Sequence, residues 1–161
     1  NLNSIERYDL IIFSESFQYV NMSVSLDKVA KMLGLGGHLL ICDFFRLEVP
    51  EKSLMGGGHR WEAFKKIIEN TKLDLVSDDN ITNGTAPTLD FLDQFCQEVL
   101  KPIFYMTGEY MLSNHSKISH LLKWKFRGRI DKINKRYLSG GVNGDSFKKF
   151  KTYRLLLYKL G

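Results

Sequence analysis

Polar side chains that can contact a ligand follow two apolar stretches of the sequence. Ser14 and Glu15 come directly after the apolar run 8–13, and the loop 56–60, with the sequence Gly-Gly-Gly-His-Arg, follows the apolar run 38–45. Histidine takes up and releases a proton near neutral pH, and arginine binds anionic groups. Structural alternatives stand beside these roles, because Ser14 can cap a turn and the three glycines can form a plain flexible linker.

The two apolar runs are typical of strands that are buried on both faces, as in a parallel sheet covered by helices. Between them, apolar residues at helical spacing predict a helix over residues 26–33, with Ser23 or Ser25 as its N-cap. The glycine-rich segment 34–37 is expected to end this helix and to open the second strand. We do not interpret it as a phosphate-binding loop, because such loops follow a strand and open a helix.

A strand, a helix and a second strand in this order make the two strands parallel. The carboxyl ends of parallel strands meet at one edge of an open sheet, where ligands bind. We therefore expect Ser14, Glu15 and the loop 56–60 to lie at the same edge.

The rest of the chain predicts a mixed α/β fold. Apolar spacing indicates a helix that begins at Trp61, a third strand near residues 73–79 and a last strand at 150–160. Between these strands, residues 87–138 predict two long helices, the first beginning at Thr88 and bent near Pro102. The last strand is expected to lie antiparallel between the second and third strands.

Three segments carry a resemblance to a known family: residues 8–20, residues 32–41 and residues 150–157. An apolar strand, a helix, a glycine pair and a second strand, with an antiparallel last strand, resemble class I S-adenosylmethionine-dependent methyltransferases. The resemblance implies a Rossmann-like sheet, here incomplete and made of the family's strands four to seven, with a helical insertion before the last strand. Leu35 departs from the proline usual in the family, and Tyr19 stands where many relatives carry histidine.

The glycine-rich cofactor motif of this family, and the acidic residue that holds the ribose, have no counterpart in this sequence. The resemblance therefore implies the C-terminal part of a methyltransferase domain (1–86 and 139–161), with 87–138 as a helical insertion or lid. We expect this chain alone to be inactive and to bind S-adenosylmethionine poorly. The full-length protein is expected to methylate a small-molecule acceptor. The exposed edge of the strand 8–13 is expected to cause dimerisation or aggregation.

The resemblance also implies roles for individual residues. His59 is the expected general base or acceptor-orienting residue, and Arg60 is expected to hold an acidic group of the acceptor. The other expected contacts are Phe13, Ser14 and Glu15 for the cofactor, and Tyr105 and Tyr110 for the acceptor.

Positive charge is concentrated near the end of the chain. The net charge is +5, and residues 115–136 contain eight Lys and Arg residues but only one Asp. A solvated helix face is the preferred interpretation. The alternative function is a non-catalytic methyltransferase-like domain whose basic helix binds nucleic acid or a protein partner; a glycine-rich motif upstream would favour the enzyme.

Composition sets further expectations. No stretch approaches the roughly 20 apolar residues of a membrane span, and residues 1–7 lack the pattern of a signal peptide. Cys42 and Cys96 are expected to be reduced, buried thiols, and the histidines lack metal-ligand spacing with them. We therefore expect a cytoplasmic protein without a metal, and neither a membrane nor nucleic acid as its partner.

Overall fold

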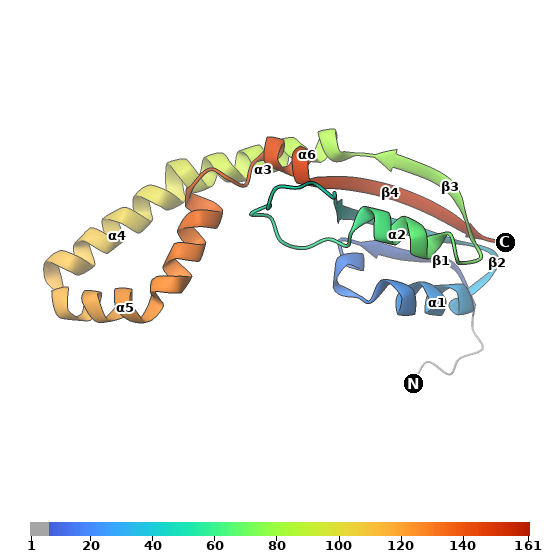
Figure 1. Cartoon of the computed structure of the whole chain (residues 1–161), viewed down its shortest axis with the longest axis horizontal. Coiled ribbons are helices and arrows are strands. Elements are labelled where there is room, and N and C mark those ends of the chain that lie inside the picture. The colour runs from blue at the N-terminus through green and yellow to red at the C-terminus, as the bar shows by residue number, and fades with distance from the viewer. Residues whose placement is uncertain (1–6) are drawn as a thin grey trace. The chain divides into compact units, whose positions relative to one another are not determined.

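The computed structural model describes residues 7–161, apart from the side chain of Arg136. The segment 1–6, which belongs to the N-terminus predicted to lack a signal peptide, lies outside the described residues. One mixed sheet contains four strands in the order β1-β2-β4-β3 (Figure 1). The strands are β1 (Tyr8–Ser14), β2 (Leu33–Arg46), β3 (Leu73–Asn80) and β4 (Lys151–Leu160).

The pairing of the strands confirms the predicted topology. Strand β1 is parallel to β2, with Ile11 opposite Leu39. Strand β4 lies between β2 and β3 and is antiparallel to both. Because β4 is antiparallel, its first residues lie at the same edge as the carboxyl ends of β1 and β2.

Two helices cover one face of this sheet (Figure 1). They are α1 (Met22–Met32) and α2 (Trp61–Ile68), and a short 3-10 turn, η1 (Phe17–Tyr19), precedes α1. The core between helices and sheet is mainly apolar. Its largest apolar members are Phe17, Leu26, Leu39, Ile41, Phe45, Phe64 and Leu156.

Both ends of α1 differ from the expectation. The N-cap is Asn21, whose side-chain oxygen accepts a hydrogen bond from the backbone N–H of Val24 at 3.2 Å, so neither predicted serine caps the helix. The helix already ends at Met32, because Leu33 is extended and begins β2. Among the glycines that follow, Gly36 alone has a positive φ, of 76°, so these residues shape the start of the strand instead of capping the helix.

The long helical segment begins earlier than predicted. Helix α3 (Thr82–Phe95) starts six residues before Thr88 and contains Pro87. A π-helical turn, η2 (Cys96–Leu100), joins it to α4 (Lys101–Asn114). The irregularity therefore precedes Pro102, which sits in the first turn of α4, where a missing N–H costs little. Helix α5 (Ser116–Ile133) follows and ends in a second π turn, η3 (Asn134–Leu138).

A short helix, α6 (Gly144–Phe150), lies between the long helical segment and β4, where no helix was predicted. Asn143 and Ser146 form a reciprocal cap at its start. The Asn143 side chain accepts from the Ser146 N–H at 2.9 Å, and the Ser146 hydroxyl accepts from the Asn143 N–H at 3.0 Å. This is the geometry of a capping box.

The contacts within the chain divide it into two compact units. The sheet unit comprises residues up to 51, residues 56–84 and residues 148–161, and the helical unit comprises residues 52–55 and 85–147.

Candidate functional site

Three strand ends and one loop meet at the carboxyl edge of the sheet unit. Strand β1 ends at Ser14, β2 ends at Arg46 and β4 begins at Lys151. The loop 56–60 hydrogen-bonds to this edge through the backbone of Arg46, whose N–H donates to the His59 carbonyl at 2.7 Å. The structure thus brings the predicted residues of β1 and of the loop to the same edge.

The three residues predicted to contact a cofactor close β1. Phe13 is half-buried, and its ring packs edge-to-face on Phe17 at 5.3 Å. Ser14 is exposed. Glu15 is exposed and has a φ of 47°, in the left-handed region that residues other than glycine rarely adopt. Its backbone N–H donates to the Cys42 carbonyl at 2.8 Å, which holds the turn after the strand in place.

The side chain of Glu15 is the last acceptor in a chain of hydrogen bonds that the sequence analysis missed. The Cys42 thiol donates to the Tyr153 hydroxyl at 3.8 Å, and that hydroxyl donates to the Glu15 carboxylate at 2.7 Å. Burial, followed by the hydrogen bonds to Glu15 and Cys42, raises the pKa of Tyr153 far above its usual range. Tyr153 therefore remains a neutral donor that fixes the orientation of the carboxylate.

A second missed residue is Asp43, which is only 1% exposed. Its carboxylate accepts from the backbone N–H groups of Gln18 at 3.0 Å and Phe44 at 2.8 Å. Burial raises the pKa of the Asp43 carboxyl, and the backbone hydrogen bonds oppose that shift. The Gln18 side chain in turn accepts from the Gly58 N–H at 3.3 Å, so Asp43 supports the loop through Gln18.

The loop itself is anchored and requires its glycines. The ammonium group of Lys151, a residue only 1% exposed, donates to the carbonyls of Gly56 and Gly57 and lies 5.2 Å from the centre of the Phe44 ring. Gly57 and Gly58 have φ values of 76° and 77°. A Cβ on Gly58 would lie 2.9 Å from the Phe44 carbonyl oxygen. A side chain is therefore excluded by both conformation and space.

His59 is half-buried, and its ring has a defined tautomer. Nε2 lies 2.9 Å from the Phe17 carbonyl oxygen. A carbonyl only accepts, so Nε2 carries the hydrogen and Nδ1 keeps the lone pair. The ring also packs edge-to-face on the Phe17 ring at 5.4 Å. The imidazole is thus held by packing and by one hydrogen bond.

Arg60 is engaged by an acidic neighbour. Its Nε and Nη2 atoms lie 2.8 and 2.7 Å from Oε1 of Glu48. Both side chains are substantially exposed, so the ion pair is screened by solvent and weak. An anionic ligand at Arg60 would compete with Glu48.

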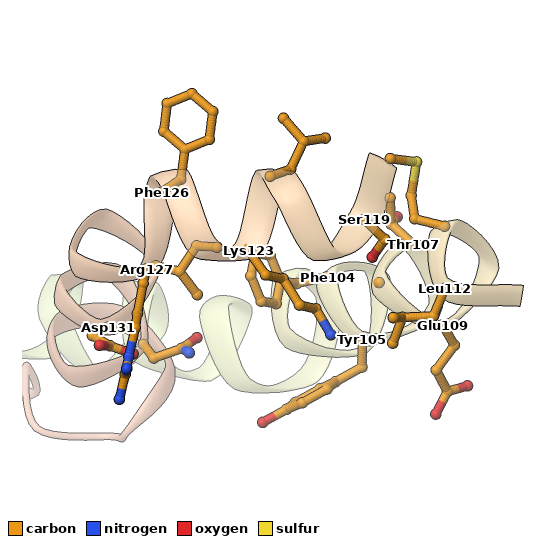
Figure 2. Close-up of a pocket in the computed structure, with 15 residues that line it drawn as sticks. Phe104, Tyr105, Thr107, Glu109, Leu112, Ser119, Lys123, Phe126, Arg127 and Asp131 are labelled. Atoms are coloured by element: carbon orange, nitrogen blue, oxygen red, sulfur yellow. The ribbon is translucent and has the colours of Figure 1, made fainter. Parts of the chain in front are cut away.

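The helical unit contains its own cavity, of about 790 Å³, between α4 and α5. Figure 2 shows Phe104 and Lys123 directed into the space between the two helices, and Phe126 also lines the cavity. Tyr105 lines the cavity, as does Arg127. The lining is mainly apolar, with a few charged side chains, as in pockets that bind amphiphilic small molecules.

Tyr110 does not line this cavity. The Tyr110 side chain is 64% exposed, and Met106, one turn earlier on α4, is 69% exposed. The two tyrosines predicted to contact an acceptor therefore occupy different faces of the same helix.

The described residues also bear on metal binding, membrane spanning and thiol chemistry. Within residues 7–161, no group of three or more His, Cys, Asp or Glu side chains is arranged to hold a metal ion. Nor does any helix in that range combine the length and apolarity that crossing a membrane requires. Cys42 and Cys96 are free thiols, half-buried instead of fully buried as predicted.

Comparison with known proteins shows similarity in structure only. No protein-family model matches the chain, and no curated protein matches its sequence. The cyclopropane synthase MmaA2 from Mycobacterium tuberculosis matches 96% of this chain, with a TM-score of 0.61 and 15% identity. Geranyl diphosphate C-methyltransferase from Streptomyces coelicolor A3(2), in complex with Mg²⁺, geranyl-S-thiolodiphosphate and S-adenosyl-L-homocysteine, matches 99%, with a TM-score of 0.58 and 10% identity.

A third match is the O-methyltransferase of a trans-AT polyketide synthase multienzyme of Brevibacillus brevis, in complex with S-adenosyl-L-homocysteine. It matches 97% of this chain, with a TM-score of 0.53 and 12% identity. The fold is that of the class I S-adenosylmethionine-dependent methyltransferases. The chain spans about half the length of these three structures, 56%, 49% and 45% respectively. The methyltransferase resemblance stated from the sequence is thus confirmed for the fold, including the incomplete sheet.

Proposed function

We propose that this chain supplies part of the active site of an enzyme that transfers a methyl group from S-adenosylmethionine to a small-molecule acceptor. One observation carries the proposal: a methyltransferase sheet whose carboxyl edge gathers a positioned carboxylate, Glu15, and a positioned imidazole, His59. Fold alone does not determine function, whereas polar groups gathered at this edge of an open sheet are where ligands bind.

The end of β1 suits the polar parts of the cofactor. Ser14 presents an exposed hydroxyl, and the Glu15 carboxylate is oriented by Tyr153 and can accept further hydrogen bonds. The half-buried ring of Phe13 offers apolar contact beside them. We assign these three residues to the cofactor. When bound, S-adenosylmethionine supplies an electrophilic methyl group.

His59 and Arg60 are proposed to serve the acceptor. With Nε2 donating to the Phe17 carbonyl, Nδ1 is the ring atom that can take a proton from the acceptor or orient it. Arg60 can exchange Glu48 for an acidic group of the acceptor, because exposed ion pairs contribute only about 0–1 kcal/mol. The main contribution of the protein is to position the two reactants.

The helical unit is proposed to supply acceptor-binding residues and to act as a lid. Its cavity has apolar walls and is lined by Lys123 and Arg127 as well as by Glu109 and Asp131, which suits an acceptor with an apolar body and a polar or acidic group that the two cations contact. Tyr105 lines this cavity, and Tyr110 is assigned to the acceptor as a second contact.

Cofactor binding is the first test. S-adenosyl-L-homocysteine is titrated by calorimetry into the protein of full natural length, and we expect saturable binding. Glu15→Gln should weaken it about tenfold, the loss expected when a charge-assisted hydrogen bond becomes a neutral one. The matched control is Glu62→Gln on α2, which removes the same charge beside Lys65. An absence of binding by the full-length protein would overturn the proposal.

The acceptor side is tested by transfer of a tritium-labelled methyl group into a small-molecule extract. His59→Ala should lower turnover about 10²- to 10⁴-fold, as for a lost general base, and should leave cofactor affinity unchanged. His38→Ala is the control, because His38 lies near the other end of β2. Tyr105→Ala and Tyr110→Ala should raise the acceptor KM without unfolding the protein. Equal turnover in His59→Ala and in wild type would remove His59 from the site.

A further inference from the structure

Helix α5 presents lysines and large apolar side chains on one exposed face. Residues of an α-helix advance by about 100° each, so seven positions of α5 fall within an arc of about 120°. We name this set the α5 outer face; its members are Lys117, Ile118, Leu121, Trp124, Lys125, Gly128 and Lys132. On the opposite side of the helix, Ser119 is only 4% exposed.

The apolar members of the α5 outer face are far more exposed than core residues. Trp124 is 78% exposed, Leu121 is 60% exposed and Ile118 is 55% exposed. They are consecutive on the same side of the helix, so they form a patch and are not scattered surface residues. An exposed apolar patch with a charged border marks a surface that binds a protein or a membrane.

The charged members of the face are all positive. Lys117 precedes the apolar patch, and Lys125 and Lys132 follow it, so the three lysines bracket the patch along about 22 Å of helix. Asp131, the acidic residue of α5, falls outside the arc. Long lysine side chains can keep their ammonium groups at phosphate level while the neighbouring apolar side chains insert more deeply.

We propose that the α5 outer face docks on the surface of bilayers that contain anionic phospholipids. The three apolar side chains would enter the headgroup region, and the three lysines would contact lipid phosphates, as in interfacial amphipathic helices. This attachment is peripheral and needs no membrane-spanning segment. It does not depend on the proposed methyl transfer.

Lipid suits this face better than nucleic acid does. Single-stranded nucleic acid binds to rows of aromatic side chains on which bases stack, and the α5 outer face has one aromatic residue, Trp124. Contact with RNA would also leave Leu121 and Ile118 in water, whereas a bilayer interface buries them. The combination of aliphatic side chains and lysines therefore favours a lipid surface.

The test is co-sedimentation of the protein of full natural length with vesicles. One set contains equal parts of phosphatidylcholine and phosphatidylglycerol, and the other contains phosphatidylcholine alone. We expect binding to the anionic vesicles only. Binding should be lost near 1 M salt, where the screening length falls to about 3 Å from about 10 Å at 0.1 M. Equal binding to both vesicle types would overturn the proposal.

Paired variants separate the α5 outer face from net charge. Lys117→Gln with Lys132→Gln should weaken anionic-vesicle binding about 25-fold, at about fivefold for each lysine. The control, Lys28→Gln with Lys31→Gln, removes the same charge from exposed positions of α1 and should change binding less than about twofold, as expected for residues away from the contact. Equal weakening by both pairs would mean that net charge alone drives binding, and would overturn the proposal.

The apolar contribution has its own matched pair. Trp124→Ala should weaken anionic-vesicle binding about tenfold or more, because a large aromatic side chain leaves the interface. Tyr19→Ala, at a residue that is 80% exposed in the sheet unit, should leave it unchanged. Circular dichroism checks that each variant keeps its helices. Binding to an RNA oligonucleotide together with no vesicle binding would overturn the proposal in favour of nucleic acid.

Discussion

Phe17→Ala should remove the centre of the aromatic cluster that supports the candidate site. The Phe17 side chain is fully buried. Its ring lies 5.3 Å from Phe13, 5.4 Å from His59 and 5.7 Å from Phe64, each in edge-to-face geometry. Its carbonyl oxygen also receives the hydrogen bond from His59, so a change in packing at this residue reaches the imidazole directly.

The size of the effect follows from the burial and the ring contacts. A fully buried Phe→Ala substitution costs about 3–5 kcal/mol in transfer and cavity energy. Because three edge-to-face pairs are lost here, each worth about 0.5–1.5 kcal/mol beyond burial, we expect the upper part of that range, about 4–5 kcal/mol. Phe17→Leu keeps most of the volume and should cost about 1.5 kcal/mol. The larger loss is about a quarter or more of the usual 5–15 kcal/mol of total stability.

The assay is urea unfolding followed by tryptophan fluorescence. Trp61 stacks on Phe64 in the sheet unit, whereas Trp124 belongs to the helical unit and is 78% exposed. In a Trp124→Phe background, the signal therefore reports the sheet unit alone. The control is Tyr19→Ala in the same 3-10 turn, which should change stability by less than about 0.5 kcal/mol.

The result also has a local signature. The Gly58 N–H, which donates to Gln18, should exchange with solvent faster in Phe17→Ala, because the turn that carries Gln18 loosens. A loss of less than about 1 kcal/mol in Phe17→Ala, well under the cost of a buried Phe→Ala substitution, would refute the view that this ring organises the cluster.

Three further predictions concern buried or constrained groups of the sheet unit. Burial raises the pKa of Asp43 above 3.8, so its contribution to stability is greatest below about pH 4 and is lost as the pH rises through the raised pKa. Asp43→Asn should flatten that part of the pH dependence, measured as the difference in urea midpoint between variant and wild type. Burial raises the pKa of Tyr158 to about 12, so stability falls from about pH 10 until the pH passes that value. Tyr158→Phe should remove about 3 kcal/mol of the loss in stability between about pH 10 and pH 12, again measured as the difference in urea midpoint from wild type. Gly58→Ala should destabilise by about 1–3 kcal/mol, because Gly58 has a positive φ and its Cβ would meet the Phe44 carbonyl. Gly84→Ala, on a helix with nothing within 4 Å of the new Cβ, should instead stabilise by about 0.5–1 kcal/mol in thermal unfolding.

The sheet was predictable where the sequence is locally consistent. The apolar runs of β1 and β2 have the pattern of buried strands, and the helix between them fixes their parallel direction. The placement of β4 between β2 and β3 came from the family resemblance, because nothing in its own residues specifies a neighbour. The structure confirms both the parallel pairing of β1 with β2 and the position of β4.

The helix boundaries failed at the start of α3. The apolar stripe from which this helix was predicted begins near Thr88, whereas the Asn80 side chain accepts from the Thr82 N–H at 3.1 Å and α3 begins there. Asn143 is a residue type that often caps helices, but the residue three positions on is Ser146 and not the Glu or Gln that marks a capping box in a sequence, so no such signature indicated α6.

The site itself was only partly predictable. The edge that gathers Glu15 and His59 follows from topology. In contrast, the partner of Glu15 is Tyr153, 138 residues away. No local pattern marks Asp43 as a buried carboxylate, since it sits within an apolar run and its partner, Gln18, lies in another element. Such pairs are set by strand register, which the residues alone do not reveal.

The central position of β4 has a consequence for the order of folding. Strand β3 pairs with β4 and not with β2, so residues 73–80 cannot join the sheet until residues 151–160 have left the ribosome. During that interval the edge of β2 that later pairs with β4 is open. Pairing of β3 with β4 must then close a loop of about 70 residues. Long-range pairing of this kind slows folding and exposes unpaired strands to association. The helical segment made in the meantime has mostly local contacts and can form first, so β4 should complete the sheet in the last and slowest step.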